Sequence, residues 1–483
     1  MQAPRAGKPV GSYPHVNRSD SYARDRTSRS LISSCIFLSV TNVILGLAFG
    51  SIVLIFILGK RSPVLNSIFL LLPIFTSTIY PGLLGETILE ISTQGSVGDR
   101  LRYLAIIVGP FVMGVIGTLN IKIDGSAKAT ETKSDSIITG AILLIFPILE
   151  LFSIFSLKPV NGIGQSIYVP FATAIISMFL VLFIALDQID IDSFRAAAEY
   201  LLICTFLFLL INQLVRGITW PSQISSLYAS EEQSLRFSPF ASILNLESRQ
   251  GYFESDAQRF AMFALLSFAV LWTSNSVTRR ITGCAIVFML GSTTQSRLFY
   301  IGVIAIVITQ LLRKISPSWG LLPRIVYLLF IFFTYVFTLS EAGNIGNDEI
   351  STLSARTYIW GITLDHWNDA STLFAHSGAY SLASFSKENS TLFLIYHAHS
   401  MVLQLLWDWG IFGLITGFIV IFLICKAYLF IPWPGFVIGT IILIQGLVEP
   451  VLYFNVTSTQ LLFLLIYVKY IYASKHTESE SVP

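Results

Sequence analysis

The sequence predicts an all-α protein that crosses a membrane many times. Hydrophobic residues make up 54% of its 483 residues and charged residues only 12%, whereas soluble domains carry roughly 25% charge. Mean hydropathy is +0.71. Apolar runs near the bilayer-spanning length of about 20 residues recur along the chain, so we expect a polytopic helical bundle of about 12–14 spans. The composition excludes a soluble enzyme, a disordered chain and a disulfide-stapled secreted domain.

The apolar runs divide the chain into membrane segments, loops and tails. The runs are 31–58, 64–83, 101–121, 136–157, 164–186, 199–215, 259–274, 281–295, 297–313, 321–340, 400–426, 436–453 and 457–473. We expect a disordered basic cytoplasmic tail at 1–30, membrane helices in 31–215, a long outer loop at 216–258, membrane helices in 259–340, a second outer loop with an interfacial helix at 341–398, membrane helices in 399–473, and a cytoplasmic tail at 474–483.

The distribution of Lys and Arg predicts the orientation, because cytoplasmic loops are enriched in these residues. One side receives Lys60–Arg61, the loop around Lys128, Arg279–Arg280, Lys426 and Lys469. That side should be cytoplasmic, and both long loops then lie outside. A single helix over 31–58 would place the basic tail outside as well, so a bent or re-entrant 31–58 is the alternative.

Neither net charge nor cysteine spacing indicates a nucleic-acid or metal partner. The formal net charge is +2, which gives no strong field for nucleic acid. Each of the four cysteines lies in an apolar run, and no pair has the spacing of zinc ligands. We expect them to be small buried hydrophobic residues.

Four ionisable groups fall at the predicted outer ends of spans, where charges are costly and often functional. They are Arg216, Arg297, Glu150 and Glu449. Each also has a structural interpretation: the arginines can extend toward the membrane surface, and the glutamates can form hydrogen bonds within the bundle. Their convergence on one side of the membrane favours a shared site.

Histidines are a second group of candidate functional residues, because four of the six lie between residues 366 and 399. A metal site is one interpretation, although no cysteine or carboxylate accompanies them with metal-ligand spacing. A general base is another, because imidazole titrates near neutral pH and can accept a proton from a sugar hydroxyl. His366 and His376 also fit surface positions in a hydrated loop.

His399 stands at the start of the 400–426 run, at the predicted outer interface. His397 is too close in sequence to share its helical face. Asp408, nine residues on, falls on the opposite face, so we do not expect it to orient His399 directly.

The 351–367 segment predicts an interfacial amphipathic helix anchored by tryptophans such as Trp360. Arg356 on this helix could bind a phosphate through two parallel hydrogen bonds, or could simply contact lipid phosphate. A separate acidic pair, Asp190-Ile191-Asp192, resembles the metal-binding pair of nucleotide-sugar enzymes, but it lies on the predicted cytoplasmic side.

Three stretches together resemble the O-antigen ligase and O-antigen polymerase superfamily of bacterial membrane glycosyltransferases. Thr294-Gln295-Ser296-Arg297-Leu298 is similar to the family's Ser-Arg step, and Ser354-Ala355-Arg356 through Trp360 to the start of its large periplasmic loop. His399-Ser400-Met401-Val402-Leu403, continuing through Asp408 to Gly413, is similar to the family's histidine motif. The family usually has asparagine where Ser400 stands. The likeness covers about 120 residues and implies a GT-C-like fold with two long periplasmic loops.

The resemblance implies a multi-pass protein of the bacterial inner membrane that uses a glycan carried on undecaprenyl diphosphate. An acceptor sugar hydroxyl, on a glycan or a lipid core, attacks the anomeric carbon with inversion and without metal or other cofactor. By this resemblance His399 is the general base, and Arg297 and Arg356 bind the diphosphate. Arg216 is a further diphosphate candidate by position, and His397, Glu150 and Glu449 are supporting candidates.

The sequence leaves two alternatives open. Polymerase and ligase share the motifs, and the two long outer loops favour a polymerase because donor and acceptor would both be growing glycans. A lipid-linked glycan flippase or another transporter without catalysis would carry charges through the whole membrane thickness. The observed charges gather toward one side, which disfavours the transporter.

Overall fold

The protein is described from a computed structural model, and every described residue belongs to the compact unit Pro63–Pro483. Helices account for 90% of the described residues, and these contain no strand. The described residues are 63–84, 107–112, 114–115, 140–145, 147–149, 151, 168–185, 190–219, 240, 243–244, 246, 250–254, 257–315, 324–326, 328–329, 332–333, 336, 356–369, 382, 385, 398, 400–428, 431, 433–446 and 461–470. The expected all-α class is therefore confirmed for this part of the chain.

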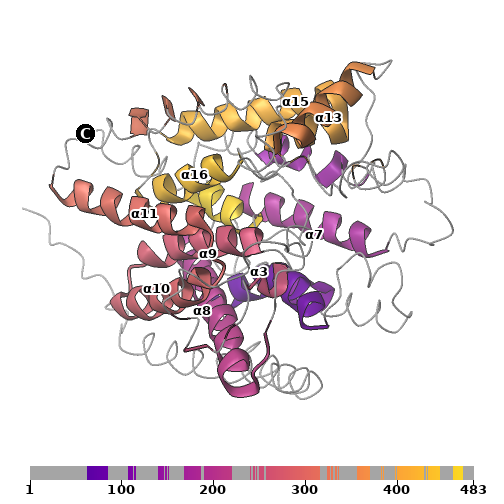
Figure 1. The fold of residues 1–483 in the computed structure, drawn as a ribbon. Helices are drawn as coiled ribbons and strands as arrows, with labels where there is room; N and C mark the ends of the chain where they lie inside the picture. Colours follow the sequence, from indigo (N-terminus) through magenta and orange to yellow (C-terminus); the bar gives the residue numbers. More distant parts are fainter. Residues whose placement is uncertain are drawn as a thin grey trace, which may run out of the picture. The chain divides into compact units, whose positions relative to one another are not determined.

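Figure 1 shows the described helices, most of which overlap a predicted apolar run. In chain order they are α3 (Pro63–Leu84), α7 (Tyr168–Ala185), α8 (Ile191–Arg216), the short 3-10 helix η2 (Tyr252–Glu254), α9 (Ala257–Trp272), α10 (Val277–Ser292), α11 (Arg297–Ile315), α13 (Arg356–Asp369), α15 (Met401–Tyr428) and α16 (Trp433–Gly446). An unlabelled apolar helix follows at Leu461–Tyr470. The runs 64–83, 164–186, 259–274, 281–295 and 297–313 therefore predicted helices within a few residues at each end, whereas α8 begins well before its run of 199–215.

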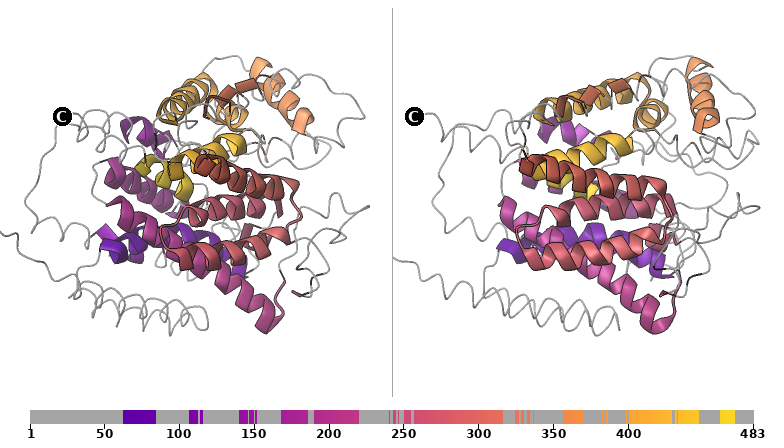
Figure 2. Two further views of the ribbon diagram at one scale, coloured as in Figure 1. Left: turned by 90° about the vertical axis from the view of Figure 1, so that its left-hand side faces the viewer. Right: turned by 60° about the vertical axis from the view of Figure 1, so that its left-hand side comes forward.

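Helix α9 is the centre of the described packing. It contacts α10, α11 and α16, while α8 contacts both α3 and α10; the two views in Figure 2 show α8 to α11 grouped in the same way. The rings of Phe206 and Phe263 stack with centroids 5.5 Å apart, and Phe263 meets Phe463 at 5.7 Å. Aromatic burial on this scale is a large source of packing energy.

Successive helices α8 to α11 alternate in direction, which gives this group two distinct ends. Residues near the start of α8 contact the α9–α10 turn. Residues near the end of α8 contact η2, and η2 contacts the end of α10. Glu199 and Gln213, which mark the two ends on α8, are about 21 Å apart along the helix axis.

Two described helices are long and apolar enough to cross a membrane, by length and composition: Ile191–Val215 and Met401–Lys426. Exposed apolar side chains follow one face of α11 at Ile301, Ile304, Ile308 and Leu311, a spacing that places them on one stripe. These features favour membrane association.

The 400–426 run is not one straight helix, because α15 breaks at Gly410. This residue has φ 58° and ψ −144°, a conformation available essentially only to glycine. A Cβ added at Gly413 would lie 2.2 Å from the Leu405 carbonyl oxygen, an approach that a continuous helix does not make. The chain therefore turns sharply at Gly410, and the segment after it packs closely on the segment before it.

Candidate functional site

The structure locates the backbone of three predicted diphosphate-binding residues, each at a helix end. Arg216 is the last residue of α8, Arg297 is the first of α11 and Arg356 is the first of α13. Their side chains lie outside the described part of the molecule. The other predicted site residues also lie outside the described residues: His399, His397, Glu150 and Glu449.

A buried polar cluster connects the helix ends that carry Arg216 and Arg297. We call it the Tyr252 cluster, comprising Gln213, Tyr252 and Thr293. The Tyr252 hydroxyl donates to Gln213 Oε1 at 3.2 Å and lies 3.0 Å from Thr293 Oγ1. Gln213 is in the last turn of α8, and Thr293 is just before the turn into α11. The two arginines predicted from the sequence therefore flank one polar contact region.

The turn that leads into Arg297 is tight and buried. Gln295 has a positive φ of 54°, while Thr294 and Ser296 are almost completely buried. Ser296 donates from its hydroxyl to Gln258 Oε1 at 3.0 Å, and its N–H donates to Thr294 Oγ1 at 3.3 Å. The polar residues of the Thr294–Arg297 motif thus fix the backbone from which α11 begins.

Burial sets the chemistry of the Tyr252 cluster. It raises the pKa of the Tyr252 phenol, because the charged form would lose its hydration. The hydroxyl is therefore neutral at physiological pH and can both donate and accept. The Gln213 Nε2 and Gln295 Nε2 amide nitrogens are buried without a hydrogen-bond partner, so each of these two donors has unused capacity.

Helix α13 packs against the beginning of α15, which follows the predicted histidine. Their shared core contains Ile359, Trp360, Leu382, Ala398, Leu403, Leu406 and Trp407. The His366 ring stacks on Trp407 with centroids 4.2 Å apart and lies 4.8 Å from Phe385. The helix headed by Arg356 and the segment next to His399 therefore belong to one packed unit.

This packing corrects two expectations about the 351–367 segment. The helix is present, but Trp360 is only 5% exposed and packs against protein, so it does not serve as an anchor in the lipid headgroups. His366, expected at the surface of a loop, is partly buried between aromatic rings. The sequence could not show that α15 covers this helix.

The entry to α15 is fixed by a short chain of hydrogen bonds. The Ala398 N–H donates to Gln404 Oε1 at 2.7 Å, and Gln404 Nε2 donates to Asp408 Oδ1 at 2.9 Å. All three residues are buried. Ala398 is the residue between His397 and His399 in the sequence.

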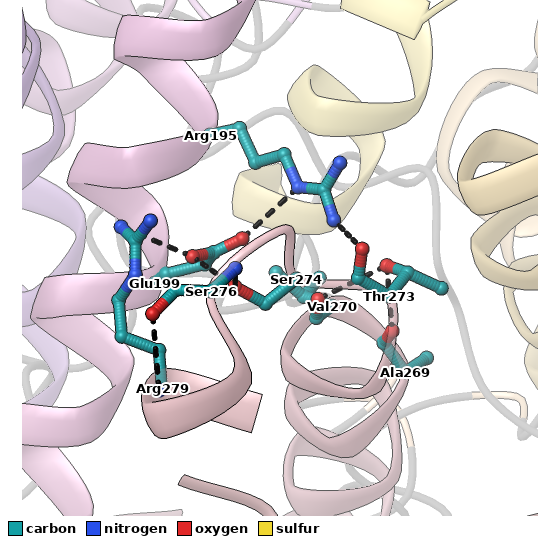
Figure 3. Close-up of polar contacts among 8 residues, drawn as sticks. All are labelled: Arg195, Glu199, Ala269, Val270, Thr273, Ser274, Ser276 and Arg279. Carbon is teal, nitrogen blue, oxygen red and sulfur yellow. Dashed lines mark hydrogen bonds and ion pairs between the residues drawn. The ribbon is translucent and has the colours of Figure 1, made fainter. Parts of the chain in front are cut away.

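The opposite end of the α8–α10 group holds a second polar cluster, which the sequence analysis did not identify (Figure 3). We call it the Glu199 cluster. Glu199 is 1% exposed and pairs with Arg195 at 3.0 Å and with Arg279 at 3.2 Å. The Ser274 hydroxyl donates to the same carboxylate at 2.7 Å, and Arg195 donates to the Thr273 carbonyl. Both guanidiniums also lie over aromatic rings, on Tyr470 and Tyr200 respectively.

The Glu199 cluster joins α8 to the α9–α10 turn. A buried carboxylate is tolerated when several donors replace its hydration, and here each oxygen has a partner. In the sequence, the only indication of this cluster is the four-residue spacing of Arg195 and Glu199, which allows an ion pair on one face of a helix. Asp190, part of the acidic pair noted above, accepts from the Ser193 N–H at 2.9 Å and caps α8. Its observed role is therefore structural.

Among the described residues, no three His, Cys, Asp or Glu side chains gather as metal ligands would. No protein-family model matches the chain, and a search of curated proteins gives no match.

Proposed function

We propose that the protein transfers a glycan from undecaprenyl diphosphate to an acceptor sugar hydroxyl at the outer face of the bacterial inner membrane, as an O-antigen-type or exopolysaccharide polymerase or ligase. The packing of α13 on the start of α15 carries this proposal. It joins the helix headed by Arg356 to the segment next to His399, and both segments belong to the motifs that resemble this superfamily.

The Tyr252 cluster gives independent support. It connects the last turn of α8, which ends at Arg216, to the end of α10, from which the chain turns into Arg297 and α11. Buried polar groups of this kind hold a binding site in a fixed geometry, which matters when catalysis depends on preorganised charge. The Glu199 cluster occupies the other end of these helices.

The proposed reaction needs one base and a stabilised leaving group. The acceptor hydroxyl attacks the anomeric carbon and gives its proton to His399 as the new glycosidic bond forms. The bond between that carbon and the diphosphate oxygen breaks with its electron pair, and the polyprenyl diphosphate leaves. Arg297 and Arg356, supported by Arg216, stabilise the charge that develops on the diphosphate. The reaction as proposed uses no metal or cofactor.

The membrane provides the environment that this substrate needs. A long polyprenyl chain dissolves in lipid, so the reaction centre has to be at the bilayer surface. The two long outer loops and about 12–14 spans of the proposed multi-pass topology would surround such a centre. Glu150, Glu449 and His397 would orient the base or the acceptor from the same side.

Carrier release in proteoliposomes tests the proposal. The parent and His399→Ala proteins receive the polyprenyl-diphosphate glycan fraction extracted from a strain that lacks the gene, and free polyprenyl diphosphate is measured over time. Loss of the base should slow release by at least about 100-fold. Release at the parent rate by the His399→Ala protein would show that the general-base assignment is wrong.

Arg356→Lys asks whether the arginine binds the diphosphate bidentately. Lysine keeps the charge but lacks the planar fork, so we expect release to fall nearly as far as in the Arg356→Ala protein. Release at the parent rate by the Arg356→Lys protein would show that Arg356 contributes only its positive charge and not a bidentate contact.

Glycan analysis of the deletion strain separates polymerase from ligase. A missing polymerase should leave single-repeat glycans, whereas a missing ligase should leave full-length polymer on its lipid carrier. A missing flippase would instead leave the lipid-linked glycan on the cytoplasmic side of the membrane.

A further inference from the structure

We propose that Gln404 and Asp408 are positioning residues that hold the chain at Ala398, and with it the histidines on either side, for glycan transfer. This inference rests on the proposed function of His399. It assigns a role to Asp408, which is not expected from its place on the helix to orient the histidine directly.

The contacts form one continuous path from the carboxylate to the backbone. Asp408 Oδ1 accepts from Gln404 Nε2 at 2.9 Å, and Gln404 Oε1 accepts from the Ala398 N–H at 2.7 Å. Asp408 is 1% exposed and Gln404 is 2% exposed. Water therefore does not compete for these bonds, and their geometry is well determined by the surrounding protein.

The chemistry of the groups gives the path a direction. A backbone N–H only donates hydrogen bonds, so the Ala398 N–H selects the Oε1 side of the Gln404 amide. Nε2 is then turned toward Asp408 Oδ1, where it meets an acceptor. The reversed amide would place its nitrogen against the Ala398 N–H, and these two donors would repel each other.

The held peptide group is adjacent to the proposed base. The Ala398 N–H belongs to the peptide bond that joins Ala398 to His397, and His399 is the next residue. Catalytic side chains need support that restricts them to the productive geometry, and small misplacements carry large rate costs. Ala398 also packs in the core shared with Trp360 and Leu403. This residue is therefore held both by its backbone N–H and by its side chain.

Asp408 is an ionisable side chain within an apolar helix, and such groups are costly unless they are paired or functional. Asp408 stands two residues before the break at Gly410, in the segment of α15 that faces α13. A role limited to helix stability would affect folding alone, whereas a positioning role predicts a specific loss of turnover.

The main test compares Gln404→Leu with the parent in the carrier-release assay, with kcat and KM measured separately. Leucine removes both hydrogen bonds with a similar volume. We expect kcat to fall by about 10- to 100-fold, while KM stays within about twofold because the diphosphate-binding arginines are unchanged. Ser267→Ala is the control, because it removes a buried hydroxyl that bonds only to its own helix, and it should keep the parent kcat.

A second comparison uses the conservative variant at Asp408. Asparagine can still accept from Gln404 Nε2 through its oxygen, whereas leucine cannot. The Asp408→Asn protein should therefore recover most of the turnover that the Asp408→Leu protein loses. Hydrogen exchange gives a readout without substrate: the Ala398 amide should exchange faster in the Gln404→Leu protein while the α15 amides remain protected.

The outcomes separate this inference from the proposed function. An inactive His399→Ala protein beside a Gln404→Leu protein with parent kcat would overturn the positioning role alone. Equal losses in the Gln404→Leu and Ser267→Ala proteins, or no recovery in the Asp408→Asn protein, would overturn it as well. If the Gln404→Leu protein does not fold, the comparison of turnover in the Asp408→Asn and Asp408→Leu proteins tests the positioning role instead. Release at the parent rate by the His399→Ala protein would show that His399 is not the general base. The positioning role of Gln404 and Asp408 would then be wrong as well.

Discussion

At the scale of single residues, Glu199 shows how the protein accommodates a buried charge. Its two oxygens accept from two guanidiniums and a hydroxyl. These donors belong to α8, α10 and the α9–α10 turn, so the carboxylate connects these segments. The arginines are themselves partly neutralised and lie over aromatic rings. Removal of the carboxylate would leave two cations in a poorly hydrated site.

We therefore expect Glu199→Ala to lower the free energy of unfolding by about 3 kcal/mol, and Glu199→Gln to have a smaller effect because one acceptor oxygen remains. Thermal unfolding in detergent measures both. Asp192→Ala is the control on the same helix, an exposed carboxylate whose loss should cost at most about 1 kcal/mol. Equal effects of the two alanine variants would show that Arg195 and Arg279 do not depend on Glu199.

Tyr252 is the corresponding residue at the other end of the helices. Tyr252→Phe keeps the ring and removes the hydroxyl, leaving Gln213 and Thr293 without this partner in a buried site. The loss should be about 1–3 kcal/mol in the free energy of unfolding, measured in the same way. Stability equal to that of the parent would mean that the cluster contributes no net hydrogen-bond energy.

At the scale of helices, the break in α15 is the feature that a hydropathy profile does not reveal. The apolar run is continuous through Gly410, so hydropathy alone predicts one span. The backbone conformation at Gly410 and the close approach at Gly413 instead give two segments. The first carries Gln404 and Asp408, and the second carries an exposed apolar face at Phe412, Ile415 and Phe418.

Gly410→Ala should destabilise the protein by about 1–3 kcal/mol, because alanine rarely adopts this backbone conformation. Gly109→Ala is the control: its added methyl group meets nothing within 4 Å, and alanine favours a helix, so stability should be kept or slightly raised. Unfolding temperatures in detergent compare the two. An unchanged unfolding temperature for the Gly410→Ala protein would indicate a continuous α15.

Helix positions were predictable from sequence because each run of apolar residues is long and bounded by polar residues. The ends were less predictable: α8 begins at Ile191, well before its apolar run, because Asp190 caps it and the Arg195–Glu199 pair stabilises its first turns. The polar clusters could not be predicted, since each joins residues far apart in the sequence. Within the candidate site, the motifs identified helix starts, whereas the Gln404–Asp408 contact required three-dimensional coordinates.

At the scale of the whole molecule, the two polar clusters lie at opposite ends of the α8–α10 group. The Glu199 cluster includes Arg279 and lies at the end that the distribution of Lys and Arg assigns to the cytoplasm. The Tyr252 cluster lies at the other end, with the helix termini that carry Arg216 and Arg297. Our proposal places the reaction centre at this second end, where His399 would meet both diphosphate-binding arginines.

Cysteine cross-linking in membranes tests that convergence most directly. Cys35, Cys204, Cys284 and Cys425 are first replaced, and cysteine pairs are then introduced at 297/399 and 356/399 for a short bifunctional maleimide. The Gln310→Cys/Trp433→Cys protein is the positive control, because these side chains are 2.6 Å apart. The proposal predicts that both test pairs cross-link as readily as the control. A control that cross-links while neither test pair does would contradict a shared site for the imidazole and the two guanidiniums.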